Sequence, residues 1–297
     1  MILDVGSIGL DTTRTPFRTV TEVIGGSATF FGIVASFFAE TGLVGVIGDD
    51  FPNEHLRILE ERLDLTGLVV KKGRTFRFDS QFGYDLGVRT TLKTELNVFG
   101  EWSPVIPEKY ADAEYVYIGN IGPDQQLRVL DQVKDPKLTV ADTIEFWIKN
   151  QRDRLTELIS RVDCMVLNDE EVRQLSQTPN IIKGAKTILE LGPDLIIIKK
   201  GEHGAILFTR EMIFPTCGYP LEEIEDPTGA GDCFAGGFMG HLARKGDISQ
   251  KTLREAVVYG NVMGSFAVER FGVERFLTLT MEEIESRYQK YKRMVSF

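Results

Sequence analysis

Cysteine and histidine are scarce in this chain, with three residues of each among 297. The three cysteines include no C-x-x-C pair, and the histidines form no cluster with the spacing of metal ligands. These absences argue against a disulfide framework and against a structural zinc site, and sparse cysteine is typical of a reducing compartment. We therefore expect a cytoplasmic protein.

The chain also lacks an excess of basic charge and any long apolar run. Its 34 Lys and Arg residues face 44 Asp and Glu residues, which gives a net charge of -10. An acidic chain of this kind is not expected to bind nucleic acid or anionic membranes. The apolar residues 30–38 are too few to cross a bilayer, and residues 1–10 lack the basic start of a signal peptide. The predicted partner is therefore a small molecule.

Two common nucleotide-binding motifs are missing. Gly6-Ser7-Ile8-Gly9 follows the first predicted strand but lacks the G-x-G-x-x-G spacing of dinucleotide-binding enzymes. No G-x-x-x-x-G-K-[ST] loop occurs anywhere in the chain. A dinucleotide-dependent oxidoreductase and a P-loop kinase are therefore not predicted.

What the chain does have is a regular alternation of strands and helices after residue 115. The strand predicted at 195–198 consists of four large aliphatic residues, which indicates burial on both faces. Such alternation predicts a parallel sheet with right-handed crossovers, ending in a hairpin at 205–208 and 211–214. A hydrophobic content of 42% is enough for a substantial core.

Residues 12–24 and 67–100 break this alternation. They are rich in β-branched and aromatic residues and show no helical period. We expect short strands here, including one at 69–70 and one at 97–99. Together these strands are predicted to form a small sheet over one end of the main domain.

The segment richest in chemical information is residues 226–237, DPTGAGDCFAGG. Gly229 and Gly231 allow the backbone to approach a ligand closely, and a helix is predicted to begin beside them. The unpaired amides at the start of a helix form an anion site, and Asp232 in the first turn can accept a proton from a bound hydroxyl. The plainer alternative is a helix-capping Asp with glycines that serve only packing.

This run resembles the C-terminal motif of the PfkB carbohydrate kinase family, within the ribokinase-like superfamily. Gly25-Gly26 before a small-residue helix resembles the family's N-terminal motif, and the likeness extends over most of the chain. It implies a Rossmann-like three-layer α/β/α sandwich with a mainly parallel central sheet and a small β-sheet lid. Residues 1–297 are then expected to form a single kinase domain, with lid segments at about 12–24 and 75–99.

The resemblance also implies roles for individual residues and a requirement for ATP and Mg²⁺. Asp232 resembles the catalytic base, and Gly229, Ala230 and Gly231 resemble the anion hole. Asn168 and Glu171 match the family's N-x-x-E motif for Mg²⁺, although an Asn that caps a helix is the alternative. The expected nucleotide-binding residues are Asn168, Lys200, Gly201, Gly204, Thr228 and Asn261. Lys200 as a solvated lysine and Asn261 as a packing residue are the alternatives, and carbonyls around Asp226, Thr228 and Gly272 resemble a K⁺ site of some relatives.

The acceptor is expected to be a small polyhydroxylated molecule, either a sugar or a sugar-like compound. Asp11, Gly25 and Gly26 resemble its binding residues, and the second-tier candidates are Asn97, Asn120 and Asp142. Phe30 stands where ribose-recognising relatives have an Asn, and lid aromatics at 76, 78, 82 and 84 can stack on a base or a sugar. A nucleoside kinase and a non-catalytic sugar-sensing module are the alternatives, and an apolar lid predicts a homodimer through it.

Overall fold

The computed structural model describes residues 1–296, and within them the chain forms one large sheet and one small one. The large sheet contains β1 (Ile2–Val5), β4 (Thr41–Gly48), β5 (Asp64–Lys71), β8 (Tyr115–Ile118), β9 (Leu138–Asp142), β10 (Cys164–Asn168), β11 (Leu195–Lys199), β12 (Ala205–Phe208) and β13 (Ile213–Thr216). Their order across the sheet is β13-β12-β11-β10-β9-β8-β1-β4-β5. Neighbours from β5 to β11 pair in parallel, and β12 and β13 pair antiparallel at one edge. The predicted mainly parallel sheet and its terminal hairpin are confirmed.

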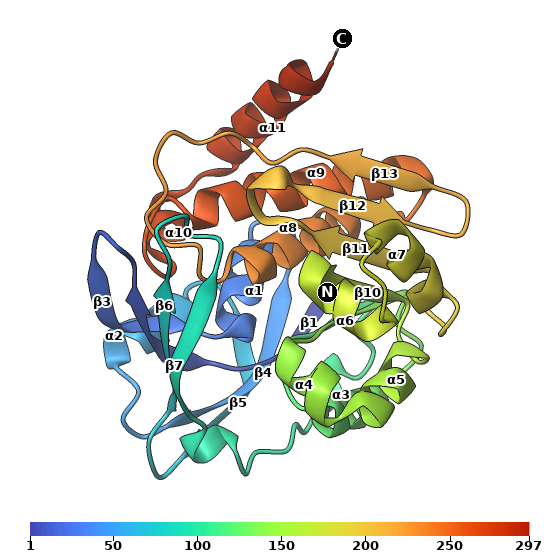
Figure 1. Ribbon diagram of the computed structural model, residues 1–297. Helices are drawn as coiled ribbons and strands as arrows, with labels where there is room; N and C mark the ends of the chain where they lie inside the picture. The colour runs from blue at the N-terminus through green and yellow to red at the C-terminus, as the bar shows by residue number, and fades with distance from the viewer. Residues whose placement is uncertain (297) are drawn as a thin grey trace.

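Helices cover both faces of this sheet (Figure 1). The described helices are α1 (Ser27–Ala35), α2 (Asn53–Glu60), α3 (Pro123–Leu130), α4 (Glu145–Asn150), α5 (Arg152–Ile159), α6 (Asp169–Ser176), α7 (Ile181–Leu189), α8 (Ala230–Lys245), α9 (Gln250–Ala267), α10 (Glu274–Thr278) and α11 (Met281–Val295). Side chains of α1, α8 and α9 pack on one face, and those of α3 to α7 pack on the other. The three-layer α/β/α arrangement follows, because strands buried on both faces need a helical layer on each side. Among the described residues, no helix combines the length and the apolar character needed to span a bilayer.

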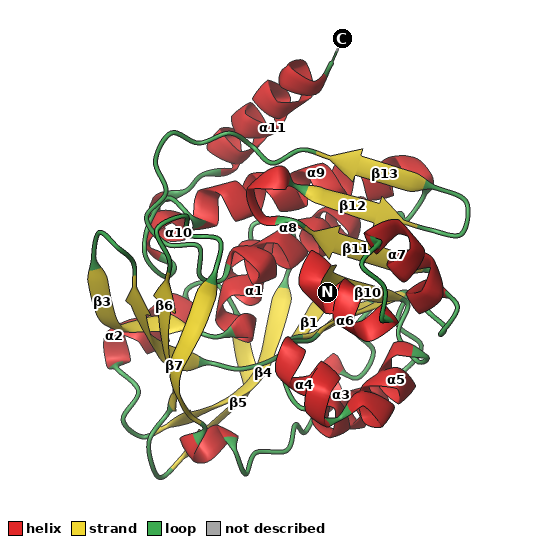
Figure 2. Cartoon of the chain, in the orientation of Figure 1, coloured by secondary structure: helices red, strands yellow, loops and turns green. Residues whose placement is uncertain are grey.

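The small sheet stands apart from the large one, beside α2 (Figure 2). Its strands are β2 (Gly9–Arg14), β3 (Thr19–Gly25), β6 (Phe76–Phe82) and β7 (Arg89–Glu95), in the order β3-β2-β6-β7. The pairing of β2 with β6 is parallel and joins the two sequence segments that were expected to form one ribbon. The second sheet is thus confirmed, and its action as a lid stays a prediction.

Two local predictions in this region were wrong, and two short helices elsewhere were not predicted. Residues 69–70 lie in β5 of the large sheet, and residues 97–99 form a 3₁₀ turn, Asn97–Phe99. Phe99 packs against Trp102 in the core on the α3 side, so tertiary packing overrides the β propensity of this segment. The short helices α4 and α10 had no counterpart in the predicted elements, because five or six residues give too little helical period to detect.

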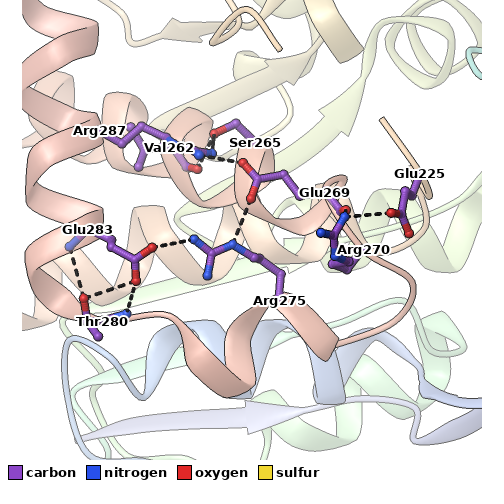
Figure 3. Close-up of polar contacts among 9 residues, drawn as sticks. All are labelled: Glu225, Val262, Ser265, Glu269, Arg270, Arg275, Thr280, Glu283 and Arg287. Atoms are coloured by element: carbon purple, nitrogen blue, oxygen red, sulfur yellow. Dashed lines mark hydrogen bonds and ion pairs between the residues drawn. The ribbon is translucent and has the colours of Figure 1, made fainter. Parts of the chain in front are cut away.

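The C-terminal helices are joined by a network of ion pairs (Figure 3). The Glu269 carboxylate, just beyond α9, pairs with Arg275 of α10 at 2.8 Å and with Arg287 of α11 at 2.5 Å. Arg275 also pairs with Glu283 at 2.7 Å, and Glu283 forms a capping box with Thr280 at the start of α11. We call these residues the C-terminal network. The network fixes α10 and α11 against the end of α9. The loop leading to α8 runs past the same place, because the amides of residues 225 and 226 donate hydrogen bonds to the carbonyl of residue 268.

Candidate active site

The site is built around the first turn of α8. Gly229 caps this helix with a φ of 74°, in the left-handed region that glycine adopts most readily. The first helical bond runs from the Cys233 amide to the Gly229 carbonyl, so the amides of Gly231 and Asp232 precede the regular ladder. Helix starts of this kind favour anions, because their amides carry partial positive charge.

The two phenylalanines of α1 support this turn from below. A Cβ at Gly229 would lie 2.4 Å from the ring of Phe30, so the ring and the glycine require each other. Phe30 is 2% exposed and belongs to the core, so its side chain serves packing. Phe31 stacks on Tyr117 of β8 with ring centroids 3.8 Å apart, and Tyr117 donates a hydrogen bond of 3.2 Å to Asp232 Oδ1. Phe30 therefore packs directly against Gly229 of the α8 turn, and Phe31 supports Asp232 through Tyr117.

Polar side chains end three neighbouring strands on the α8 face of the sheet. Asp142, Asn168 and Lys199 are the last residues of β9, β10 and β11. Side chains alternate along a strand, so these three share a face with the buried residues that pack under α8. Lys199 Nζ pairs with Asp142 Oδ2 at 3.0 Å, and a Cβ at Gly231 would lie 2.9 Å from the same nitrogen. A cation thus lies directly beside the predicted anion hole.

The lysine beside this turn is Lys199, whereas the sequence analysis named its neighbour Lys200 as a nucleotide-binding candidate. Lys199 is the last residue of β11 and shares the α8 face with Ile197, whereas Lys200 lies beyond the strand, at the start of the 3₁₀ turn Gly201–His203. The Lys199 side chain is 18% exposed and reaches the turn. Burial alone would lower the pKa of Lys199, but the carboxylates of Asp142, Glu171 and Asp232 outweigh it and the pKa is raised.

The Asp232 carboxylate lies near other carboxylates and has few hydrogen-bond donors around it. Burial, and then the charge of Asp142, raise its pKa to about 7, while Lys199, the Tyr117 hydroxyl and Arg89 oppose the rise. A carboxyl with a pKa near neutrality is well matched to general-base work at physiological pH. This environment supports a catalytic role for Asp232 over a plain capping role.

Asn168 and Glu171 form a capping box at the start of α6. The Glu171 amide donates to Asn168 Oδ1 at 2.8 Å, and the Asn168 amide donates to Glu171 Oε2 at 2.7 Å. The capping alternative is therefore realised, and it holds both side chains at the same strand edge as Asp142. Burial, and then the charge of Asp142, raise the pKa of Glu171 to about 7. Within residues 1–296, no group of three or more His, Cys, Asp or Glu side chains could hold a metal ion by itself.

Asp11 of β2 faces the turn from the small sheet. Its carboxyl lies against Gly25, where a Cβ would be 2.0 Å from Asp11 Oδ2, and Gly26 has a φ of 95° at the start of α1. Within the described chain, Asp11 Oδ1 has no hydrogen-bond partner although it is buried. Burial, and then the charge of Asp226, raise the pKa of Asp11 to about 7. A buried acceptor of this kind suits a ligand hydroxyl.

The same face of the small sheet carries further candidates. Thr13 lies 3.3 Å from Thr228 between their hydroxyl oxygens, which brings β2 to the loop before α8. Phe78 pairs in register with Asp11, and the guanidinium of Arg89 lies 5.2 Å from the centre of the Phe78 ring. Aromatic and polar groups therefore face the turn together.

The remaining predicted residues lie farther out. Asn261 of α9 donates to Thr216 Oγ1 at 2.8 Å, beside the loop that holds Gly201 and Gly204. The Asn97 amide donates to the Thr75 carbonyl at 2.9 Å, and Asn120 accepts from Trp147 at 3.1 Å. The Asn97 and Asn120 side chains are thus engaged in holding the fold.

Sequence reasoning missed Lys199 and Tyr117, and placed Asp142 only in its second tier. Each of the two charged residues ends an otherwise apolar strand, as LTVAD and LIIIK, and that polar ending is the signal that was available. Tyr117 gave no such signal, because YVYI reads as plain core.

Comparisons with known proteins agree with this geometry. Residues 3–278 match the family described as pfkB family carbohydrate kinase. The cytidine kinase of Thermococcus kodakarensis is 33% identical over 246 residues, 81% of this chain and 87% of that protein. The nucleoside kinase of Methanocaldococcus jannaschii has the same fold, with a TM-score of 0.78 at 21% identity over 97% of this chain and 98% of that one. Aminoimidazole riboside kinase from Salmonella enterica, complexed with aminoimidazole riboside and an ATP analogue, gives a TM-score of 0.75 at 22% identity, over 97% and 99% of the two chains.

Proposed function

Because the chain belongs to the pfkB family of carbohydrate kinases, it is a phosphotransferase acting on a hydroxyl of a sugar or nucleoside, and we propose that its acceptor is a nucleoside. The proposed catalytic base is Asp232. The observation that carries this assignment is the meeting of three features at one point: the helix start at Gly229, the Lys199 cation and the Asp232 carboxylate.

The proposed reaction is an in-line transfer from ATP. Asp232 takes the proton of the acceptor hydroxyl, whose oxygen forms a bond to the γ-phosphorus while the bond to the leaving ADP oxygen breaks. The turn at residues 229–231, whose Gly231 amide lies outside the helical ladder, faces the charge on the transferred group, and Lys199 adds a positive charge beside it. We therefore replace Lys200 with Lys199 in the proposed set, and keep Gly201, Gly204, Thr228 and Asn261 as nucleotide-binding candidates.

The acidic strand edge suits Mg²⁺. Asn168 and Glu171 would hold the ion through its water shell, because Mg²⁺ keeps most of its waters and prefers oxygen ligands. When bound, the ion supplies charge neutralisation on the phosphates. For K⁺, the proposed residues are those around Asp226, whose Oδ1 accepts from the Thr228 amide at 2.9 Å.

Two observations favour a nucleoside over a free sugar. Phe30 packs under Gly229, so it offers no polar group to a ribose at the position where ribose-recognising relatives carry an Asn. Phe78, with Arg89 over its ring, lies in register with Asp11 and gives a planar surface on which a base can stack. The names of the cytidine and nucleoside kinases among the similar proteins point the same way.

The small sheet is proposed to act as a lid and as a dimer surface. Tyr84 and Val88 in the β6–β7 turn and Leu92 of β7 are exposed apolar residues that a second copy of the chain would cover. Closure of the lid would exclude water, which competes as an acceptor. A cytoplasmic location also stays a prediction.

An acceptor panel tests the function. With ATP and Mg²⁺, we expect ADP release to be fastest with cytidine or another nucleoside and at least about tenfold slower with ribose or inositol. Asp232→Asn, with an unchanged melting temperature, is expected to lower turnover by about 10²-fold or more. Ribose as the best acceptor would refute the nucleoside assignment, and near-normal turnover of the folded Asp232→Asn protein would refute the base.

A further inference from the structure

Tyr117 is a buried ionisable residue to which the proposed chemistry gives no task. It lies on β8 in the core, and its hydroxyl donates to Asp232 Oδ1 at 3.2 Å. Burial, and then the charges of Asp232 and neighbouring acids, raise the pKa of Tyr117 well above its usual value of 10. The hydroxyl therefore keeps its proton across the physiological range and can act only as a donor to an ionised Asp232.

The position of the Tyr117 ring is fixed on the side away from Asp232. Phe31 of α1 stacks on it with an interplanar angle of 3° and a centroid distance of 3.8 Å. Phe31 itself is fully buried, so the stack leaves little freedom for the Tyr117 side chain. A rigid donor of this kind fixes the direction in which one carboxylate oxygen points and leaves the other free to face the acceptor.

We propose that Tyr117 is a positioning residue: its hydroxyl orients the Asp232 carboxylate toward the acceptor and favours the charged form of that carboxylate. This inference rests on the proposed role of Asp232 as base. A hydrogen bond to the charged form of an acid favours that form, so loss of the donor shifts the ionisation of Asp232 to higher pH. The Tyr117 hydroxyl is neutral, so it orients Asp232 without adding a second charge beside Lys199 and the phosphate.

Other charged groups also act on Asp232 and must stay constant in any test. From the strands these are Asp4 of β1, Asp11 of β2, Arg89 of β7, Asp142 of β9 and Lys199 of β11. Glu171 of α6 shares the same neighbours, Asp142 and Lys199. Only a change that leaves all of these in place can isolate the hydroxyl, and Tyr117→Phe removes one oxygen and keeps the stacked ring.

The same strand supplies a matched control. Tyr115 is also buried on the α8 face of β8, and its hydroxyl donates to the Leu242 carbonyl at 3.5 Å near the other end of α8. Tyr115→Phe removes the same atom from the same strand, away from Asp232. A purely structural effect of losing a buried hydroxyl should therefore appear in both variants.

The experiment is the pH dependence of the single-turnover rate from pH 5 to 9, with saturating ATP and acceptor. We expect the acidic limb for Tyr117→Phe to move up by about one pH unit, so that its rate at pH 6, taken as a fraction of its own plateau, is about tenfold lower than the same fraction for wild type. Tyr115→Phe should keep the wild-type limb. An unshifted limb in folded Tyr117→Phe, whatever its plateau rate, would overturn the proposal.

A second substitution covers the case in which Tyr117→Phe does not fold. Fluorotyrosine at position 117 keeps the hydroxyl and makes it a stronger donor, so the acidic limb should move to lower pH. No movement, or movement to higher pH, would contradict the proposal. The Asp232→Asn variant distinguishes failure of the proposed base from failure of the positioning role. Normal turnover in Asp232→Asn would refute Asp232 as the base. Loss of turnover in Asp232→Asn, together with an unshifted acidic limb in Tyr117→Phe, would refute only the role of Tyr117.

Discussion

The active site and the C-terminal network place acidic side chains in opposite surroundings. In the active site, Glu171 and Asp232 lie near the Lys199–Asp142 pair and Asp11 lies near Asp226 and Asp232, and each of the three has its pKa raised to about 7. In the C-terminal network, each acid meets an arginine at 2.5–2.8 Å. The Arg275 guanidinium, by its hydrogen bond, lowers the pKa of Glu283.

The difference shows which part of the molecule holds the fold and which part is arranged for chemistry. Acids that repel one another in a buried place cost stability, and such sites persist because they serve function. Ion pairs between helices, in which each acid has an arginine partner, stabilise the fold instead. The two regions should also respond to pH with opposite sign, since groups with a raised pKa destabilise the fold as pH rises and groups with a lowered pKa do so as pH falls.

The largest expected effect comes from removing the positive charge of Lys199 in the active site. Lys199→Met keeps most of the side-chain volume but leaves Asp142, Glu171 and Asp232 without their nearest positive charge. We expect turnover to fall by about 10²-fold or more, the scale for losing a group that stabilises transition-state charge. Lys200→Met is the matched control and should change turnover less than twofold. Equal turnover in the two folded variants would remove the assignment to Lys199, and a larger loss in Lys200→Met would return it to Lys200.

The next effect concerns the C-terminal network. Glu269→Gln leaves Arg275 and Arg287, which are 19% and 16% exposed, with a neutral partner. We expect the free energy of unfolding to fall by about 1–3 kcal/mol, because hydrogen-bonded charges lose their counter-charge in a partly buried place. Urea denaturation measures this, and turnover per folded molecule should stay within twofold.

Glu225→Gln provides the contrast for that prediction. Glu225 pairs with Arg270 at 2.7 Å on the surface, where the two side chains are 36% and 54% exposed. Exposed pairs contribute little, so the loss should stay below about 0.5 kcal/mol. If the two variants lose the same stability, the distinction between a joined network and a lone surface pair does not hold.

The same contrast explains what the sequence could predict. The layered fold follows from apolar strands that alternate with amphipathic helices, and the α8 turn follows from its glycines, because both are local patterns. The choice between Lys199 and Lys200 depends on which face of β11 meets α8, and the role of Tyr117 depends on a ring contributed by α1. Contacts between distant segments carry no local signal, and a one-residue error reverses the face.

Residues 97–99 illustrate the opposite failure, in which a local pattern was present and misleading. Their side chains resemble a strand, but Phe99 is needed beside Phe76 and Trp102 in the core, and the backbone turns to place it there. The C-terminal network was not predicted either, since its acids and arginines look in sequence like the exposed charges of any helix.

The last prediction tests whether the crowding of acidic groups in the active site reaches into the core. Asp4 of β1 is fully buried, and within residues 1–296 neither of its carboxyl oxygens has a hydrogen-bond partner. Burial, and then the charge of Asp232, raise the pKa of Asp4 well above its usual value. The folded state therefore binds this proton more tightly than the unfolded chain, so the free energy of unfolding falls as pH rises above about 4.

Asp4→Asn removes that penalty while keeping the shape of the side chain. We expect it to be more stable than wild type at pH 8 and to lose this advantage as the pH falls toward 4.5, because the folded state retains the Asp4 proton more readily than the unfolded chain does. Glu60→Gln on the exposed side of α2 controls for the change in net charge. A gain of equal size at both pH values would mean that shape and not ionisation limits the stability at this position, and a loss at pH 8 would mean that the Asp4 carboxylate has a partner such as a buried water. Only a gain in the free energy of unfolding that is confined to high pH agrees with the view that the crowded acids of the active site destabilise the fold.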